Sequence, residues 1–198
     1  YLGTYNDYTT MSASAIKYIT GDNASKIGET QFPSHLVTVS EATVKARVVT
    51  APEAGKAYKF ALEQNRKGQT LYFTGEMDGN YLATSDKTEK AVDLTLEAAE
   101  GGYRAYFMKD GKKLYVDLYE YTAGKIGVQL TETPTCVYVW NAELSIPVAN
   151  LLDTQYYLGT YNDYTTMSAS AIKYITGDNA SKIGETQFPS HLVELVTE

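Results

Sequence analysis

The feature that most constrains this chain is an identical repeat: the 37 residues from Tyr1 to Val37 recur letter for letter as residues 157–193. The chain of 198 residues is therefore one unit with a period of 156 residues, the offset from Tyr1 to Tyr157, plus a second copy of part of that unit. Because point mutations blur old duplications, such an identity indicates a recent repeat, a homogenised tandem array or chain ends chosen by hand. A unit of this size is expected to hold one domain with its own core.

Short alternating runs rich in Tyr, Thr and Val are separated by Gly, Asp and Asn, and long apolar patterns with the 3.6-residue period of a helix are missing. Alternation with a period of two is typical of strands with one buried face. The sequence therefore predicts an all-β domain, with hairpin turns at Asp78-Gly79 and Asp110-Gly111. Twelve strands are predicted, at residues 57–63, 70–75, 81–85, 92–97, 103–109, 113–119, 125–130, 136–140, 148–152, 156–161, 166–172 and 188–195.

The twelve predicted strands fall into three consecutive sets of four. Tyr58, Tyr103 and Val148, each in a first strand, are spaced by 45 and 45 residues, and the second strands open at spacings of 43 and 42 residues. Three pseudo-equivalent sets of four strands predict a β-trefoil, which is a six-stranded barrel closed at one end by three hairpins. The alternative is a β-sandwich in which these spacings are accidental.

Four tyrosine-containing phrases share a common form: Ala57-Tyr58-Lys59-Phe60-Ala61-Leu62, Gly79-Asn80-Tyr81-Leu82-Ala83-Thr84, Gly101-Gly102-Tyr103-Arg104-Ala105-Tyr106-Phe107 and Tyr156-Tyr157-Leu158-Gly159-Thr160-Tyr161. They resemble tandem-repeat, β-trefoil-like accessory modules of large secreted or cell-surface proteins from gut-dwelling Gram-positive bacteria, over residues 51–193. The resemblance implies an extracellular or cell-surface location and a structural, repeated module. It implies no defined ligand, and the Gln-x-Trp motif of ricin-type lectins is missing.

This organisation divides the chain into three parts. Residues 1–37 are expected to be the duplicated C-terminal part of a preceding module, residues 38–50 a connector that adds a short strand, and residues 51–198 the β-trefoil module. The chain begins at Tyr1 rather than Met, so we expect it to be a segment of a longer protein.

The duplication gives one set of acceptor strands two identical donor segments, and one donor is always left over. A leftover donor is expected to stay disordered unless it completes the barrel of a neighbouring chain, because ordering a segment without burying apolar surface is unfavourable. This predicts a self-assembly element that works by strand exchange. Its assembly residues are expected to be Tyr1, Leu2, Tyr5, Tyr157, Leu158 and Tyr161.

Charge and hydropathy exclude several classes of partner. The formal net charge is −7, and the Lys and Arg residues are scattered singly, so nucleic-acid binding is not expected. No apolar run approaches the roughly 18 residues of a membrane span, which predicts no membrane insertion. The expected partners are carbohydrate, neighbouring modules and copies of the chain itself.

Catalytic chemistry has few candidates. The single cysteine, Cys136, lies in an apolar run that predicts a buried, inert thiol, and His35 and His191 are one position of the repeat seen twice. Ser190 precedes His191, but neighbouring residues of a strand point to opposite faces, so the two side chains are not expected to meet. Metal-ligand spacings and phosphate-binding loops are missing, so we expect no enzyme, no metal and no cofactor.

Aromatic residues beside amides and carboxylates are the remaining functional signal, since sugar rings stack on aromatic faces while their hydroxyls need polar partners. The best glycan-binding candidates are Tyr161, Asn162, Asp163 and Tyr164, which the N-terminal copy repeats as Tyr5-Asn6-Asp7-Tyr8. Trp140 with Asn141 and the Tyr119-Glu120-Tyr121 run follow.

The alternation of the second strands raises one further possibility for binding. It directs Leu71 and Phe73, Leu114 and Val116, and Tyr156 and Leu158 to the interior. Tyr72, Tyr115 and Tyr157 then lie on the opposite face, either as a three-fold binding surface or packed beneath other parts of the chain.

The function expected from the sequence is thus that of a non-catalytic extracellular repeat module for adhesion, spacing or glycan contact in a bacterial surface protein. The alternative is the self-assembly element, in which residues 1–37 or 157–193 complete a neighbouring barrel.

Overall fold

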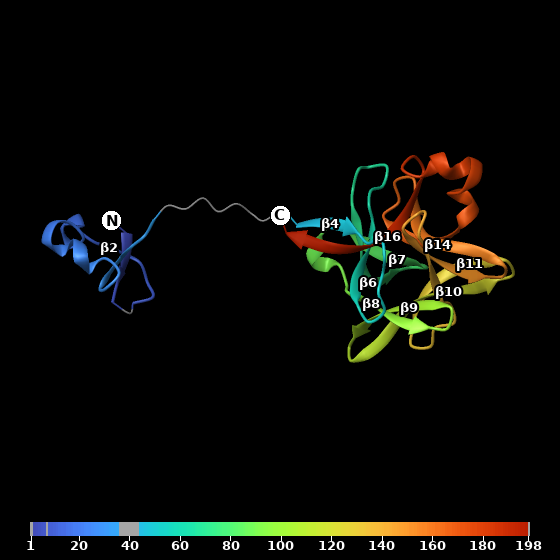
Figure 1. Ribbon diagram of the computed structural model, residues 1–198, viewed down its shortest axis with the longest axis horizontal. Helices are drawn as coiled ribbons and strands as arrows, with labels where there is room; N and C mark the ends of the chain where they lie inside the picture. Colours follow the sequence, from blue (N-terminus) through green and yellow to red (C-terminus); the bar gives the residue numbers. More distant parts are fainter. Residues whose placement is uncertain (1, 7, 36–43, 198) are drawn as a thin grey trace. The chain divides into compact units, whose positions relative to one another are not determined.

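The computed structural model describes residues 2–6, 8–35 and 44–197 (Figure 1). The chain divides into two compact units, Tyr1–Ala42 and Thr43–Glu198. Both are built from antiparallel strands, so the predicted all-β class is confirmed.

The second unit contains thirteen strands among residues 44–197. A short first strand, β4, is followed by three successive groups of four, and all twelve strands predicted from the alternation are confirmed with ends that differ by a few residues. The strands are β4 (Val44–Val48); β5 (Ala57–Leu62), β6 (Leu71–Asp78), β7 (Tyr81–Ser85) and β8 (Leu94–Ala99); β9 (Gly102–Lys109), β10 (Lys112–Thr122), β11 (Lys125–Thr131) and β12 (Tyr138–Asn141); β13 (Ile146–Leu151), β14 (Thr154–Tyr161), β15 (Thr166–Ala171) and β16 (Gln187–Thr197).

The first and fourth strands of the three groups are linked in a ring. Hydrogen-bonded ladders join β5 to β8, β8 to β9, β9 to β12, β12 to β13 and β16 to β5, and β13 contacts β16. The second and third strands of each group form the hairpins β6–β7, β10–β11 and β14–β15. The third strands meet one another, because β15 pairs with β7 and β11 contacts both.

The expected connector, residues 38–50, is described only from Val44 onward, and residues 36–43 lie outside the described residues. Within it, β4 runs antiparallel to the C-terminal end of β16, from Val48 opposite Val193 to Val44 opposite Thr197. Figure 1 shows the two strands side by side.

The core lies between the ring and the hairpins, and aromatic packing is its most specific feature. The rings of Phe73 and Phe107 meet edge to face, with centroids 5.8 Å apart and an interplanar angle of 83°. Gly75, which lies at the irregularity in β6, has a φ of +79°, and a Cβ added there would come within 3.0 Å of the Phe107 ring. Glycine at this position therefore permits both the bend of the strand and the close approach of the ring.

The tyrosines predicted to face away from the barrel are not a binding surface: Tyr72, Tyr115 and Tyr157 are all buried. Tyr72 packs with Ala61 and Val193. The alternative, packing beneath other parts of the chain, is correct because both faces of these strands are covered.

Hydroxyl bonds and apolar neighbours account for the other two tyrosines. The Tyr115 hydroxyl donates a hydrogen bond of 2.6 Å to Glu97, and the Tyr157 hydroxyl donates one of 2.7 Å to Gln187. Tyr157 also packs with Ile146 and Ile175. On the barrel side of the same strands, alternation is confirmed by a buried set of Leu71, Phe73, Val116 and Leu158, whereas Leu114 and Tyr156 are half-buried.

The N-terminal unit repeats the local structure of residues 157–189 without the other strands of the second unit. Its strands β1 (Leu2–Tyr5), β2 (Ser12–Ala13) and β3 (Gln31–Pro33) form a small sheet, with short 3₁₀ turns at Ile16–Tyr18 and Gly21–Lys26. The corresponding turns of the second unit are Ile172–Tyr174 and Gly177–Lys182. Gly3 pairs with Pro33 as Gly159 pairs with Pro189, so the segment keeps its register in both settings.

Candidate functional site

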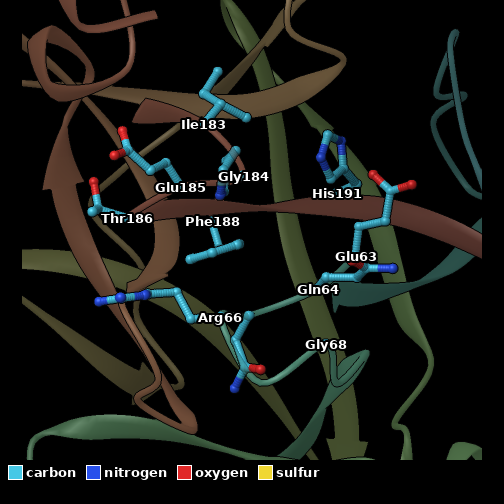
Figure 2. A pocket seen from close by; sticks show the side chains of 12 residues that line it. Glu63, Gln64, Arg66, Gly68, Ile183, Gly184, Glu185, Thr186, Phe188 and His191 are labelled. Carbon is cyan, nitrogen blue, oxygen red and sulfur yellow. The ribbon is translucent and has the colours of Figure 1, made fainter. Parts of the chain in front are cut away.

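An open cleft of about 650 Å³ lies on the second unit, between the loop that links β5 to β6 and the segment that enters β16 (Figure 2). Figure 2 shows His191 and Glu63 together on one side of the cleft, Glu185 and Thr186 on the other, and Phe188 between them. The lining residues are Glu63, Gln64, Asn65, Arg66, Gly68, Ile183, Gly184, Glu185, Thr186, Phe188, Pro189 and His191.

The first wall of the cleft is organised by Asn65, which is buried. Its side-chain oxygen accepts hydrogen bonds from the backbone N–H groups of Lys67 at 3.0 Å and Gln69 at 3.3 Å. Gly68 has a φ of +72° and donates its N–H to the Asn65 carbonyl at 2.8 Å. Asn and Gly thus close a tight loop, which leaves the side chains of Glu63, Gln64 and Arg66 at its edge.

The second wall is a turn that belongs to the duplicated segment. The Gly184 N–H donates to the Gln187 carbonyl at 3.0 Å, and Gly184 has a φ of +79°. The Lys182 ammonium contacts the Glu185 carboxylate at 3.1 Å. Phe188, which is buried and pairs with Thr160 on β14, places an apolar ring at the base of this wall.

His191 has a defined tautomer when it is neutral. Its Nδ1 lies 2.9 Å from the carbonyl oxygen of Ser145, and because a carbonyl only accepts hydrogen bonds, Nδ1 carries the proton. Nε2 of the neutral ring is then an acceptor. The half-buried imidazole therefore offers the cleft a hydrogen-bond acceptor, beside the donors of Arg66 and Gln64.

The four best glycan candidates lie on the turn between β14 and β15, next to this cleft. The Arg66 backbone N–H donates to the Asn162 carbonyl at 3.1 Å, and its guanidinium donates to the Asn162 side-chain oxygen at 3.2 Å. Asn162 also donates its N–H to the carbonyl of Thr186 at 2.8 Å. The turn is thereby bonded to both walls, and it leaves the rings of Tyr161 and Tyr164 exposed.

The polar members of that turn have different surroundings. Asn162 has a φ of +53°, and its side-chain oxygen already accepts from Arg66, so its first role is to hold the turn. Asp163 is exposed. The Asn65 amide donates to the carbonyl of Tyr164 at 3.4 Å, which fixes the far end of the turn.

Trp140 and Asn141 do not line the cleft. The Trp140 indole N–H donates to the Thr50 carbonyl at 3.1 Å, and the ring packs against the core, beside Pro52 and Pro147. Asn141 accepts the Leu144 N–H at 3.0 Å. Both residues have structural contacts that account for them.

A second, smaller hollow of about 200 Å³ is lined by Tyr81, Tyr119 and Tyr121, together with Asn80 and Ser168. The rings of Tyr119 and Tyr121 are 6.2 Å apart and tilted by 57°. Glu120, between them in sequence, accepts the Gly124 N–H at 2.6 Å in the hairpin turn. The sequence indicated the Tyr119-Tyr121 pair but not its neighbour Tyr81.

The residues that a nucleophilic mechanism would need are kept apart. Ser190 is buried and donates its hydroxyl to the Leu158 carbonyl at 2.9 Å, while His191 bonds to Ser145, so the prediction that they do not meet is confirmed. Burial raises the pKa of the Cys136 thiol to about 12, and the nearby Asp117 carboxylate adds to that shift. The thiol is therefore protonated and poorly nucleophilic at neutral pH.

Within residues 2–6, 8–35 and 44–197, no three or more His, Cys, Asp or Glu side chains lie together in a group that could hold a metal ion. In the same part of the chain, no helix has the length and apolar character needed to cross a membrane.

The proposed assembly residues differ sharply in exposure. Leu2, Tyr5 and Tyr161 are exposed, whereas Tyr157 and Leu158 are buried in the second unit. Tyr1 lies outside the described residues.

The sequence did not indicate the loop with Glu63, Gln64 and Arg66 as part of a site. Its Asn65 and Gly68 are ordinary turn residues, and only the fold brings Asn65 beside Tyr164, 99 positions away. Comparison of the chain with protein-family models, with curated proteins and with solved structures found no match.

Proposed function

We propose that the twelve strands from β5 to β16 form a β-trefoil, with β4 as part of the connector. Three features support this: the succession of three groups of four strands, the ring of pairings through their first and fourth strands, and the meeting of the three third strands. A sandwich would instead divide the strands between two facing sheets, whereas here one path of pairings runs through twelve strands.

We propose further that this trefoil is a non-catalytic, extracellular repeat module of a bacterial surface protein, and that it contacts carbohydrate. The observation that carries the proposal is the bonding of the exposed Tyr161–Tyr164 turn to a cleft with donors and acceptors on both walls. Exposed phenol rings can stack on the apolar face of a sugar ring. Glu63, Gln64, Arg66, Glu185 and His191 can then bind its hydroxyl groups.

The non-catalytic part rests on the chemistry of the reactive groups. Ser190 is buried with its hydroxyl bonded to the Leu158 carbonyl, Cys136 is buried and protonated, and Ser190 and His191 are bonded to different carbonyls, so Ser190 is not paired with the His191 ring. A module that binds without turnover suits a tandem array, because each repeat adds a weak contact and the contacts combine as avidity.

The duplication supplies a matched control for the glycan proposal. Tyr161 and Tyr164 are 49% and 63% exposed, and their counterparts Tyr5 and Tyr8 are 47% and 69% exposed. Within the second unit, the turn that carries Tyr161 and Tyr164 is bonded to the loop of Arg66. A polysaccharide that the chain binds should slow its migration when the polysaccharide is fixed in a native gel. The double variant Tyr161→Ala/Tyr164→Ala should lose this retardation, whereas Tyr5→Ala/Tyr8→Ala should keep it.

The experiment uses a panel of neutral and acidic polysaccharides, with the melting temperature of each variant as a check on folding. Equal retention of both double variants on a polysaccharide that the original chain binds would remove the turn from the site. Retention lost in both, with each variant running as a monomer, would show that the turn acts without the cleft, which also contradicts the proposal.

A further inference from the structure

Two identical segments of this chain have different surroundings, and several apolar side chains are exposed in one copy and buried in the other. Leu2 is 57% exposed and Phe32 is 40% exposed, whereas their counterparts Leu158 and Phe188 are 1% and 6% exposed. Met11 and Met167 differ in the same way. The tyrosines compared above keep nearly the same exposure in both copies. The N-terminal unit therefore presents an apolar face that its own sheet does not cover.

The second copy identifies what covers this face. Met167 pairs with Leu82 on β7, and Tyr157 pairs with Val148 on β13. His191 pairs with Ala61 on β5. In the second copy, the apolar face is therefore buried by strands from residues 44–156, which we call the acceptor strands. These strands pair with the segment in the register just given.

The N-terminal unit is already shaped as a donor. Its strand pairings match those of the second copy, and the Ser34 hydroxyl donates to the Leu2 carbonyl at 2.8 Å as the Ser190 hydroxyl donates to the Leu158 carbonyl at 2.9 Å. Domains shorter than about 40 residues usually need disulfides, metals or a partner to be stable. The segment contains no cysteine, because the one cysteine of the chain is Cys136.

From this we infer that residues 2–35 dock on the acceptor strands of a second copy of this chain, in the register that residues 158–191 use. The product is a barrel completed in trans. The docked segment also brings Glu29, Phe32 and His35 to the positions of Glu185, Phe188 and His191. The exchanged barrel therefore carries a complete cleft, half of it from each chain.

The two donors compete, and the competition favours the segment that follows the acceptor. The copies diverge at Glu194, where the N-terminal segment continues with Thr38. Glu194 is bonded to Arg47 on β4 and lies 3.0 Å from Lys56. The hydrogen bond to Arg47 and then that to Lys56 lower the pKa of Glu194. The fraction of chains with an exchanged barrel should therefore be small at low concentration. It should rise at high protein concentration, or when a substitution weakens the docking of residues 157–193.

The test weakens one donor at a time in the full chain. Leu158→Asp places a charge in the core and disables the C-terminal donor, and the matched Leu2→Asp disables the N-terminal one. We expect the Leu158→Asp chain to fold with a mass at least twice the 21.8 kDa of one chain, by light scattering behind a sizing column. The Leu2→Asp chain should fold as a monomer, and the double variant should not fold.

A second measurement covers the case in which Leu158→Asp alone fails to fold. The double variant has an acceptor but no donor, and refolding of its acceptor can be followed by the fluorescence of Trp140, the single tryptophan. The original chain, labelled to separate its signal, should restore the folded fluorescence of the double variant. The Leu2→Asp chain should not.

Three results would overturn the inference. One is a Leu158→Asp chain that folds as a monomer at every concentration, which would place the donor on its own acceptor. Another is failure of the original chain to rescue the double variant. The third is equal rescue by the Leu2→Asp chain, which would assign the exchange to another segment.

Discussion

Met11 and Met167 hold the same position in two copies of one sequence, yet 67% of Met11 is exposed and none of Met167 is. Met167 owes its burial to Leu82 on β7, with which it pairs, and to the core around it. The pair shows that the local structure of the segment comes from its own sequence, whereas its burial comes from the acceptor strands.

This pair provides the first prediction. Met167→Ala should lower the free energy of unfolding of the second unit by about 2–5 kcal/mol, because a buried side chain is replaced by a cavity. Met11→Ala should change it by less than about 0.5 kcal/mol, as expected for an exposed site. Urea unfolding followed by Trp140 fluorescence measures both. Equal effects would show that Met11 is packed in the monomer.

A second prediction concerns Gly75, with Gly111 as its control. Both have a positive φ, +79° and +77°, but only at Gly75 would a Cβ meet another side chain, the Phe107 ring at 3.0 Å. Gly111→Ala should cost about 1–2 kcal/mol through backbone strain alone. Gly75→Ala should cost about 1–3 kcal/mol more, because the ring must shift within a packed core.

The comparison uses the melting temperatures and urea midpoints of the two variants. If Gly75→Ala were no worse than Gly111→Ala, the contact between the Gly75 backbone and the Phe107 ring would not be a packing constraint.

The third prediction is a loss of stability in alkali. Burial raises the pKa of Cys136 to about 12 and that of Tyr157 to about 12, from ordinary values of 9.0 and 10.0. Between pH 9 and 12 for Cys136, and between pH 10 and 12 for Tyr157, the group has lost its proton in the unfolded chain but keeps it in the folded chain. The unfolded state therefore binds fewer protons, and the free energy of unfolding falls as the pH rises. Each group contributes about 1.4 kcal/mol per pH unit within its window.

Urea midpoints from pH 8 to 11 test this, with Cys136→Ser as the control that removes one titrating group. The variant should lose stability less steeply above pH 9 than the original chain. An unchanged slope would mean that the thiol is not kept protonated by the fold.

Much of this fold follows from the sequence alone. The alternation identifies the strands at residues 57–62 and 71–78, and it places Leu71 and Phe73 correctly on the core side, because both belong to the main core cluster whereas Tyr72 belongs to another. The same alternation could not show whether Tyr72 and Tyr157 are exposed or buried on the other face of their strands. Their far faces are covered by β16 and by the turn that holds Ile175, and that cover depends on contacts between distant parts of the chain.

The candidate site was predictable only in part. Composition led to Tyr161 and Tyr164 as exposed aromatic residues, and both are exposed. Trp140 was a further aromatic candidate, but its indole N–H bonds to the Thr50 carbonyl and its ring packs on the core. The position of Arg66 beside Asn162, 96 residues away, depends on pairings between strands that are distant in the sequence.

The most direct measurement of donor docking is disulfide capture in its predicted register. One Leu158→Asp chain carries Met11→Cys and another carries Leu82→Cys, so only a contact between two chains can join them. Antiparallel partners lie within the Cα separation that a disulfide spans. Refolded as a mixture and oxidised, the two chains should form a covalent dimer at high yield, and Tyr8→Cys in place of Met11→Cys should not. A mixture that stays monomeric, or that links equally well through position 8, would contradict docking of residues 2–35 on a second copy.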